Sequence, residues 1–362
     1  MNESIQLRIL IAGGGTGGHV FPGIAIARGF QRRHPQAEIW FVGTQRGIEK
    51  RIVPAEGFTL KTIPVSGLKG MRGLNLLKAL WNIPWGLKES YQILREFRPR
   101  LVIGVGGYSS GPPVLVAALM GIPILLQEQN ARPGITNRIL SRVADRVAVA
   151  FEECRSFFGD KTILTGNPVR PDFSQLSDRR NPDRFVLLIF GGSQGSHAIN
   201  QAMIEALESL EGHFSKLWFI HQTGEKDFEW VRGAYQAAGA EGEVRPFFDD
   251  MPLQFTRSDL VICRSGAITL AELAAAGKAA ILVPFPFAAD NHQQRNAEAM
   301  ARAGAAEMIL QSELSGKRLA QRIMLFLDHR EALLLMEQRS RQMGHPDAVE
   351  RLVSLVEEMV HV

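Results

Sequence analysis

The sequence predicts an α/β protein made of two Rossmann-like, doubly wound domains, and three observations support this prediction. At 362 residues the chain is longer than one hydrophobic core usually extends. Apolar runs without polar alternation, separated by helical patterns, indicate a parallel sheet covered by helices on both faces. A strand followed by a glycine-rich loop and a helix occurs twice, which favours two domains over one large sheet.

The first domain is expected to contain several buried strands. Apolar runs predict strands at residues 8–12, 38–42, 101–103 and 122–126. The first of these runs leads into a glycine-rich loop at residues 13–18, and Pro22 beyond the loop suits the first turn of a helix.

The second domain repeats this opening, with a strand expected at residues 185–190 that leads into the loop 191–196. Residues 166–184 have the composition of a linker, and we expect the boundary near Pro168. An apolar stripe at helical spacing predicts a final helix within residues 345–362 that packs back on the first domain. The predicted domains are residues 1–167 and 168–344.

The composition excludes several classes of protein. The hydrophobic fraction of 45% and the charged fraction of 22% are those of an ordinary globular protein. The first residues lack the pattern of a signal peptide, and no apolar run approaches the ~20 residues needed to span a bilayer. Cys154 and Cys263 are far apart and follow apolar segments, so we expect buried free thiols in a cytoplasmic protein.

The first glycine loop satisfies the pattern G-x-G-x-x-G, but a dinucleotide site also needs an acidic residue at the end of the second strand. That strand ends at Thr44, so the dinucleotide interpretation is disfavoured, and no G-K-[ST] follows either loop. The loop ends with His19, which is well placed to act as a general base beside a bound ligand. The alternative is a structural histidine packed under the loop.

Three further segments have the composition of ligand sites. The glycines and hydroxyls of residues 104–113 predict a surface for a second phosphate-bearing ligand. Residues 264–272 place Ser265 and Thr269 at a helix start suited to a diphosphate, with Glu272 one turn later able to accept from ribose hydroxyls. The alternative role for Glu272 is a capping carboxylate. Residues 284–297 are rich in amides, which suits recognition of sugar hydroxyls.

Six motifs occur in an order that resembles the MurG family, bacterial transferases that add N-acetylglucosamine to the lipid-linked muramyl-pentapeptide precursor of peptidoglycan. The similarity spans nearly the whole chain, and one departure is Gln127, where the family usually has histidine. They are Gly14-Gly15-Thr16-Gly17-Gly18-His19, Gly106-Gly107-Tyr108-Ser109-Ser110-Gly111-Pro112, Glu128-Gln129-Asn130, Gly166-Asn167-Pro168-Val169-Arg170, Gly191-Gly192-Ser193-Gln194-Gly195 and Cys263-Arg264-Ser265-Gly266-Ala267.

This resemblance implies a GT-B glycosyltransferase, in which two Rossmann-like domains face each other across a cleft. The second domain would bind most of UDP-N-acetylglucosamine, with Phe248 near the uracil and Gln293 at the sugar, Gln294 being the neighbouring candidate. The first domain would bind the acceptor through Gly106, Gly107, Tyr108 and Ser109. The other expected donor contacts are Thr16, Gly17, Gly18, Asn130, Arg170, Ser193, Ala267, Ile268, Thr269 and Glu272.

The resemblance also implies an inverting displacement in peptidoglycan synthesis, with roles in cell shape and cell division and with a cell-wall or division complex as partner. His19 is our predicted base for the acceptor 4-hydroxyl, because its unperturbed pKa of ~6.5 suits proton uptake near neutrality. Arg170, Ser193 and the helix start after Gly266 would stabilise departing UDP. The chain has no Asp-x-Asp signature, so we expect neither a catalytic metal nor a cofactor.

A lipid acceptor requires the enzyme to reach the membrane, and the charge distribution suggests where. The formal net charge is +4, yet residues 59–100 alone carry eight basic residues against two acidic ones. Apolar residues and tryptophans interleave with these charges, so we predict peripheral binding to the anionic cytoplasmic face of the membrane. The alternative is a pair of ordinary amphipathic helices. The predicted membrane contacts are Lys69, Arg72, Lys78, Trp81 and Trp85.

Two rival functions remain open from the sequence. A UDP-N-acetylglucosamine 2-epimerase shares the two-domain fold but would not need the loop at 106–113 or a basic face bearing tryptophan. A non-catalytic nucleotide-sugar-binding partner in cell-wall assembly is disfavoured by the presence of His19, Arg170 and Glu272. A nucleic-acid binder is disfavoured because the positive charge is confined to one segment without a recognition motif.

Overall fold

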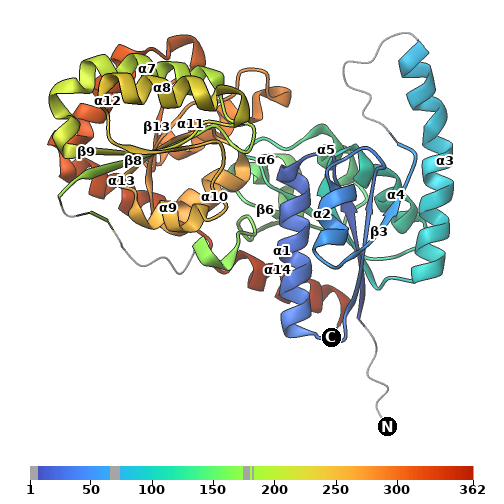
Figure 1. Ribbon diagram of the computed structural model, residues 1–362. Helices are drawn as coiled ribbons and strands as arrows, with labels where there is room; N and C mark the ends of the chain where they lie inside the picture. Colours follow the sequence, from blue (N-terminus) through green and yellow to red (C-terminus); the bar gives the residue numbers. More distant parts are fainter. Residues whose placement is uncertain (1–6, 66–73, 174–179, 182, 362) are drawn as a thin grey trace. The chain divides into compact units, whose positions relative to one another are not determined.

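The computed structural model describes residues 7–65, 74–173, 180, 181 and 183–361, and for residues 74–80 it describes the backbone (Figure 1). The chain forms two compact units. The first comprises Met1–Val169 together with Asp347–Val362, and the second comprises Arg170–Pro346.

The first unit contains, in its described residues, a seven-stranded parallel sheet of order β3-β2-β1-β4-β5-β6-β7. Alternate residues of β1 bury opposite faces: Ile9 and Ile11 pack with α1, whereas Leu10 and Ala12 pack toward α3 and α4. Both faces are therefore covered, which explains why these strands appear as unbroken apolar runs. The strands are β1 Arg8–Gly13, β2 Glu38–Gly43, β3 Thr59–Thr62, β4 Leu101–Gly106, β5 Ile124–Glu128, β6 Arg146–Val149 and β7 Thr162–Leu164.

The last helix of the chain completes this first unit. Figure 1 shows α14 beside α1, and Gly29 of α1 provides the close approach, since a Cβ there would lie 2.3 Å from Val349 Cγ1. His34 Nε2 lies 2.6 Å from Glu357 Oε1 at the same contact. The helices of this unit are α1 Gly17–Arg33, α2 Glu49–Ala55, α3 Leu74–Phe97, α4 Gly111–Leu119, α5 Ile135–Leu140, α6 Arg155–Phe158 and α14 Ala348–Val360.

The start of α1 differs from the sequence expectation. Pro22 lies inside the helix, which already begins at Gly17. The backbone N–H groups of His19 and Val20 both donate to Thr16 O, so the end of the glycine loop has closed into the first helical turn before Pro22. His19 therefore lies in that first turn.

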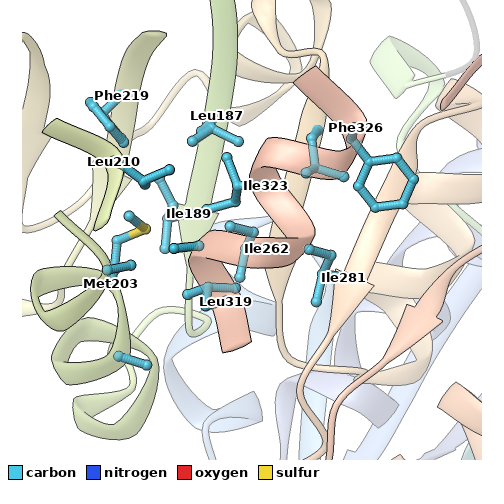
Figure 2. Packing of buried hydrophobic residues seen from close by; sticks show 14 of the residues in the cluster. Leu187, Ile189, Met203, Leu210, Phe219, Ile262, Ile281, Leu319, Ile323 and Phe326 are labelled. Carbon is cyan, nitrogen blue, oxygen red and sulfur yellow. The ribbon is translucent and has the colours of Figure 1, made fainter. Parts of the chain in front are cut away.

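The second unit contains a six-stranded parallel sheet in its described residues, of order β10-β9-β8-β11-β12-β13. Figure 2 shows one face of its core, where Leu187 and Ile189 of β8 meet Met203 of α7 and Leu319 and Ile323 of α12. The strands are β8 Phe185–Phe190, β9 Leu217–Gln222, β10 Gly242–Arg245, β11 Leu260–Cys263, β12 Ala279–Leu282 and β13 Glu307–Met308. The helices are α7 His197–Leu210, α8 Phe228–Ala238, α9 Met251–Arg257, α10 Ala267–Ala276, α11 His292–Arg302, α12 Gly316–Asp328 and α13 Arg330–Gln342.

Both sheets have the same topology around their centre. The chain order reverses between β1 and β4 in the first sheet and between β8 and β11 in the second. Ligands of such folds bind outside the carboxyl ends of the strands at this reversal. The four glycine-containing segments predicted from the sequence follow these four strands, so each unit has its candidate site at that edge.

Candidate functional site

A buried carboxylate holds the first glycine loop in shape. Glu49, at the start of α2, is 1% exposed, and its Oε2 accepts from Gly15 N at 2.8 Å. Its Oε1 accepts from Thr44 N at 2.8 Å and from Thr44 Oγ1 at 2.9 Å. A Cβ at Gly14 or Gly47 would lie 2.5 Å or less from this carboxylate. The Gly15 N–H is therefore engaged by the protein's own carboxylate rather than left for a ligand.

His19 lies against the loop that follows β4. A Cβ on Gly106 would approach His19 Nδ1 to 2.9 Å, and one on Gly107 would approach His19 Cδ2 to 3.4 Å. Tyr108 and Ser109 continue this loop as a 3-10 turn, with Tyr108 exposed and Ser109 buried. The structure thus brings the predicted base together with the predicted acceptor loop. A side chain at Gly106 would crowd the imidazole, and one at Gly107 would collide with Gly14 O at 2.6 Å.

A second buried carboxylate organises the segment after β5. Glu128 accepts from Asn130 N at 3.0 Å, Asn130 Nδ2 at 3.1 Å, Gly134 N at 3.1 Å and Asn137 Nδ2 at 2.9 Å. Burial raises the pKa of Glu128, while these hydrogen bonds oppose the rise. Asn130, predicted to bind the sugar, is therefore held in one orientation at the carboxyl edge of the first sheet. Gln127, the departure from the family motif, donates to Asn167 Oδ1 at 3.0 Å.

The second glycine loop, after β8, has a different support. Gly192 and Gly195 have positive φ angles of 90° and 72°, which glycine adopts at low cost. The side chain of Gln222, at the end of β9, donates to Gly192 O at 3.0 Å and accepts from Phe248 N at 2.9 Å. Ser193 is exposed on this loop, and Phe248, whose N–H donates to Gln222, is buried. The second glycine loop is thus supported by the neutral amide of Gln222, whereas the first is supported by the carboxylate of Glu49.

The start of α10 provides backbone donors next to this loop, because β11 pairs with β8. Gly266 is the extended residue before the helix, and Ala267, Ile268 and Thr269 form its first turn. The N–H groups of a first helical turn have no partner within the helix and favour an anion. The predicted diphosphate contacts of this segment therefore meet the loop of Ser193 at one edge of the second sheet.

Glu272 follows one turn into α10 and lies 3.6 Å from Arg170. Its side chain is only 14% exposed, and burial raises its pKa to about 7, although Arg170 opposes the rise. The Arg170 side chain is 54% exposed at the same contact. The structure therefore pairs the predicted ribose acceptor with the predicted diphosphate cation. The alternative role of Glu272 as a capping residue in the first turn does not fit, because the helix begins at Ala267.

The two candidate sugar amides have different surroundings. Gln293 Oε1 accepts from Phe285 N at 3.0 Å, and Gln293 O accepts from Ser265 Oγ at 2.8 Å. Gln294 Nε2 donates instead to Glu298 Oε1 along α11 at 2.9 Å. The backbone of Gln293 thus contacts the segment that precedes α10, whereas the side chain of Gln294 contacts its own helix.

The predicted membrane contacts are only partly described. Lys69 and Arg72 lie outside the described residues, and so does the side chain of Lys78. Among the described residues of this segment, Leu74–Phe97 form one continuous helix, α3, with Pro84 inside it. Trp81 and Trp85 are 75% and 51% exposed on this helix.

Other features of the structure bear on chemistry. Both cysteines are buried free thiols, as expected. Within the described part of the chain, no cluster of three or more histidine, cysteine or acidic side chains could hold a metal ion. None of the described helices is long and apolar enough to cross a bilayer.

The sequence did not single out Glu49 or Gln222, the two residues that support the glycine loops. Glu49 could have been noticed, since it is an acidic residue a few positions after the second strand, near the place where a dinucleotide-binding fold has its ribose-binding carboxylate. In this structure the Glu49 carboxylate accepts from the protein's own glycine loop rather than from a ribose. Gln222 follows its strand directly, and only the packing of the sheet shows what it contacts.

Two Rossmann-like units, each with glycine-containing loops at the carboxyl edge of its sheet, are the components of the GT-B fold. Residues 9–149 match the glycosyltransferase family 28 N-terminal domain, and residues 186–352 match the glycosyltransferase family 28 C-terminal domain. The chain belongs to glycosyltransferase family 28.

Named relatives agree with this membership and confirm the predicted resemblance to the MurG family. The chain is 50% identical over 353 residues to the UDP-N-acetylglucosamine--N-acetylmuramyl-(pentapeptide) pyrophosphoryl-undecaprenol N-acetylglucosamine transferase of Myxococcus xanthus, covering 97% of this chain and 92% of the relative. It is 45% identical over 361 residues to the protein of that name from Syntrophus aciditrophicus, covering 99% and 100%.

Solved structures support the fold. The crystal structure of Acinetobacter baumannii MurG matches with a TM-score of 0.82 and 33% identity, covering 97% of this chain and 99% of that one. The UDP-GlcNAc 2-epimerase from Neisseria meningitidis, bound to UDP-GlcNAc, matches with a TM-score of 0.68 and 14% identity, covering 98% and 100%. At that identity the second likeness concerns the fold alone.

Proposed function

We propose that this enzyme transfers N-acetylglucosamine from UDP-N-acetylglucosamine to the 4-hydroxyl of lipid-linked N-acetylmuramyl-pentapeptide, converting lipid I to lipid II with inversion at the anomeric carbon. The relatives named above carry this activity in their names, and they cover nearly the whole chain. The proposed binding of the donor rests on the arrangement at the carboxyl edge of the second sheet. There the loop of Ser193, the start of α10 and Glu272 follow two paired strands.

The electrostatics of the two glycine loops also favour binding of the UDP diphosphate in the second unit and of the acceptor in the first. The first loop already binds the carboxylate of Glu49, which would repel a phosphate at Gly15 N. The second loop is supported by the neutral amide of Gln222, so its field remains suited to the UDP diphosphate. Within the first unit, the loop of Gly106 and Gly107 is the better candidate for the acceptor diphosphate. The donor contacts assigned to Thr16, Gly17 and Gly18 remain predictions.

The proposed displacement uses His19 as the base. Its imidazole takes the proton of the acceptor 4-hydroxyl, the oxygen forms a bond to the anomeric carbon, and the bond from that carbon to the UDP oxygen breaks. UDP leaves with the bonding electrons, and Arg170 with the first turn of α10 stabilises the added negative charge. The packing of His19 on Gly106 and Gly107 supports this role, because the imidazole lies beside the loop that we assign to the acceptor.

The test is release of UDP from UDP-N-acetylglucosamine with and without a lipid-linked muramyl-peptide acceptor. We expect release only with the acceptor, together with a disaccharide product. Acceptor-independent release, or epimerisation of the donor at C2, would instead favour the 2-epimerase alternative. Absence of any turnover with tight UDP binding would favour a non-catalytic nucleotide-sugar-binding protein.

We also propose peripheral contact with an anionic membrane through α3 and its neighbours. Trp81 and Trp85 are exposed on α3, and Lys88 Nζ lies 5.2 Å from the Trp85 ring centroid. Exposed apolar side chains continue on α4 and α5, which pack next to α3 in turn, with Leu119 at 87% and Ile135 at 60% exposure. Tryptophan and aliphatic groups beside basic residues suit insertion at a lipid interface.

Vesicle sedimentation can test this surface. Replacing Trp81 and Trp85 by alanine, or neutralising Lys69, Arg72, Lys78 and Lys88, should reduce binding to vesicles containing anionic lipid. Trp230, 44% exposed on α8 of the second unit, provides a matched control, and its alanine variant should bind as the unmodified protein does. Undiminished vesicle binding by both sets of variants would refute the proposed surface.

A further inference from the structure

The side chain of Gln222 connects two segments that the donor is proposed to contact. It is 2% exposed, at the carboxyl end of β9 and beside β8. Its Nε2 donates to Gly192 O on the glycine loop at 3.0 Å, and its Oε1 accepts from Phe248 N at 2.9 Å. One buried amide therefore joins the loop of Ser193, assigned to the diphosphate, with the segment of Phe248, assigned to the uracil.

The backbone after Gln222 continues the same connection. Thr223 N donates to Arg245 O at 3.0 Å, on the side of the Phe248 segment. On the other side, a Cβ at Gly195 would lie 1.9 Å from Thr223 O, so the glycine loop rests directly on this strand end. The end of β9 thus lies between the two segments and fixes the spacing between them.

Glutamine is suited to this position because its amide offers a donor and an acceptor at once. A carboxylate of the same shape could accept from Phe248 N, but it would face the carbonyl of Gly192 without a hydrogen to donate. An aliphatic side chain of similar length would leave both backbone groups without their hydrogen bonds, which is costly in a buried location.

We propose that Gln222 is a positioning residue for the nucleotide donor: it does not contact UDP, but it sets the diphosphate loop and the uracil segment at the spacing that UDP requires. This inference rests on the proposed function, since that function assigns the two segments to one nucleotide. Because both segments belong to the second unit, the effect should fall on the donor and leave acceptor binding unchanged.

The experiment measures UDP affinity by calorimetry and steady-state kinetics for Gln222→Glu. We expect Kd for UDP and KM for UDP-N-acetylglucosamine to rise roughly 10-fold, the factor that corresponds to loss of one buried hydrogen bond. The acceptor KM and the kcat at saturating donor should stay within about twofold of the unmodified enzyme. Should the glutamate variant not fold, Gln222→Met, which introduces no charge, provides the same test.

A control on the opposite face of β9 separates positioning from general destabilisation. His221 Nδ1 lies 3.1 Å from Tyr235 Oη, a buried contact that is separate from both hydrogen bonds of the Gln222 side chain. Tyr235→Phe should lower the free energy of unfolding without changing UDP affinity. Equal loss of UDP affinity in Tyr235→Phe, or unchanged affinity in the Gln222 variants, would overturn the inference. If the unmodified enzyme itself failed to bind UDP, the proposed function would fall together with it.

Discussion

Replacing Glu272 by glutamine removes a charge from the proposed ribose site while keeping the size of the side chain. Burial raises the pKa of Glu272 to about 7, against an ordinary value of 4.5. Near neutral pH, then, the ligand-free enzyme holds this group as a mixture of carboxylate and carboxylic acid. Only the carboxylate can accept from both ribose hydroxyls at once.

The magnitude follows from this pKa. At pH 8 roughly nine-tenths of the groups are ionised, and at pH 6 roughly one-tenth, so UDP affinity should rise about 10-fold across this range. Stability should change in the opposite direction. A carboxyl group whose pKa is higher in the folded state stabilises the fold below pH 4.5, and this contribution is lost as pH rises through 7. The loss amounts to at most about 3 kcal/mol.

The assay is calorimetric titration of UDP between pH 6 and pH 8, with the unmodified enzyme and Glu272→Gln in parallel. Ionisation of UDP itself affects both proteins equally, so the ratio of their affinities isolates the contribution of Glu272. We expect this ratio to change about 10-fold over the range. A ratio that stays constant with pH would refute either the perturbed pKa or the contact with the ribose.

Three further substitutions test the rest of the structure. His19→Ala should reduce kcat at least about 100-fold while leaving Kd for UDP nearly unchanged, because it removes the base and not the nucleotide site; wild-type turnover would remove His19 from the mechanism. Glu49→Gln should lower kcat and the melting temperature together, since its amide cannot accept from both Gly15 and Thr44, and unchanged kinetics would show that the loop holds its shape unaided. Gly29→Ala should reduce the free energy of unfolding by about 1–3 kcal/mol, measured by denaturant titration, because its Cβ would overlap Val349.

The apolar pattern was enough to predict the fold class, because parallel strands buried on both faces leave an unbroken apolar signal. The expected strand at 185–190 has the bounds of β8. The start of α1 was harder to predict. Pro22 suggested that the first turn lies there, but the helix begins at Gly17. The difference arises because the last glycines of the loop adopt helical geometry themselves.

The sequence indicated which residues could contact a ligand more readily than which residues support them. Glu49 contacts Gly15 across 34 positions of sequence, and Gln222 contacts Gly192 across 30. No local pattern reports such pairs, because they depend on which strands become neighbours. Exposure is equally non-local: Leu119 and Ile135 look like core residues in sequence, and only the absence of covering elements in the described structure shows that they face outward.

The position of α14 has a consequence for how the chain folds during synthesis. The core of the first unit includes Leu352 and Val356, which the ribosome adds only after the whole of the second unit. Residues 170–346 are contiguous, so all strands of the second unit are synthesised before α14, the last helix of the first unit. During most of translation, therefore, the face of α1 that contacts Val349 lacks the cover of α14. Fragments ending after residue 169 should accordingly aggregate or recruit chaperones, whereas a fragment of the second unit alone should fold.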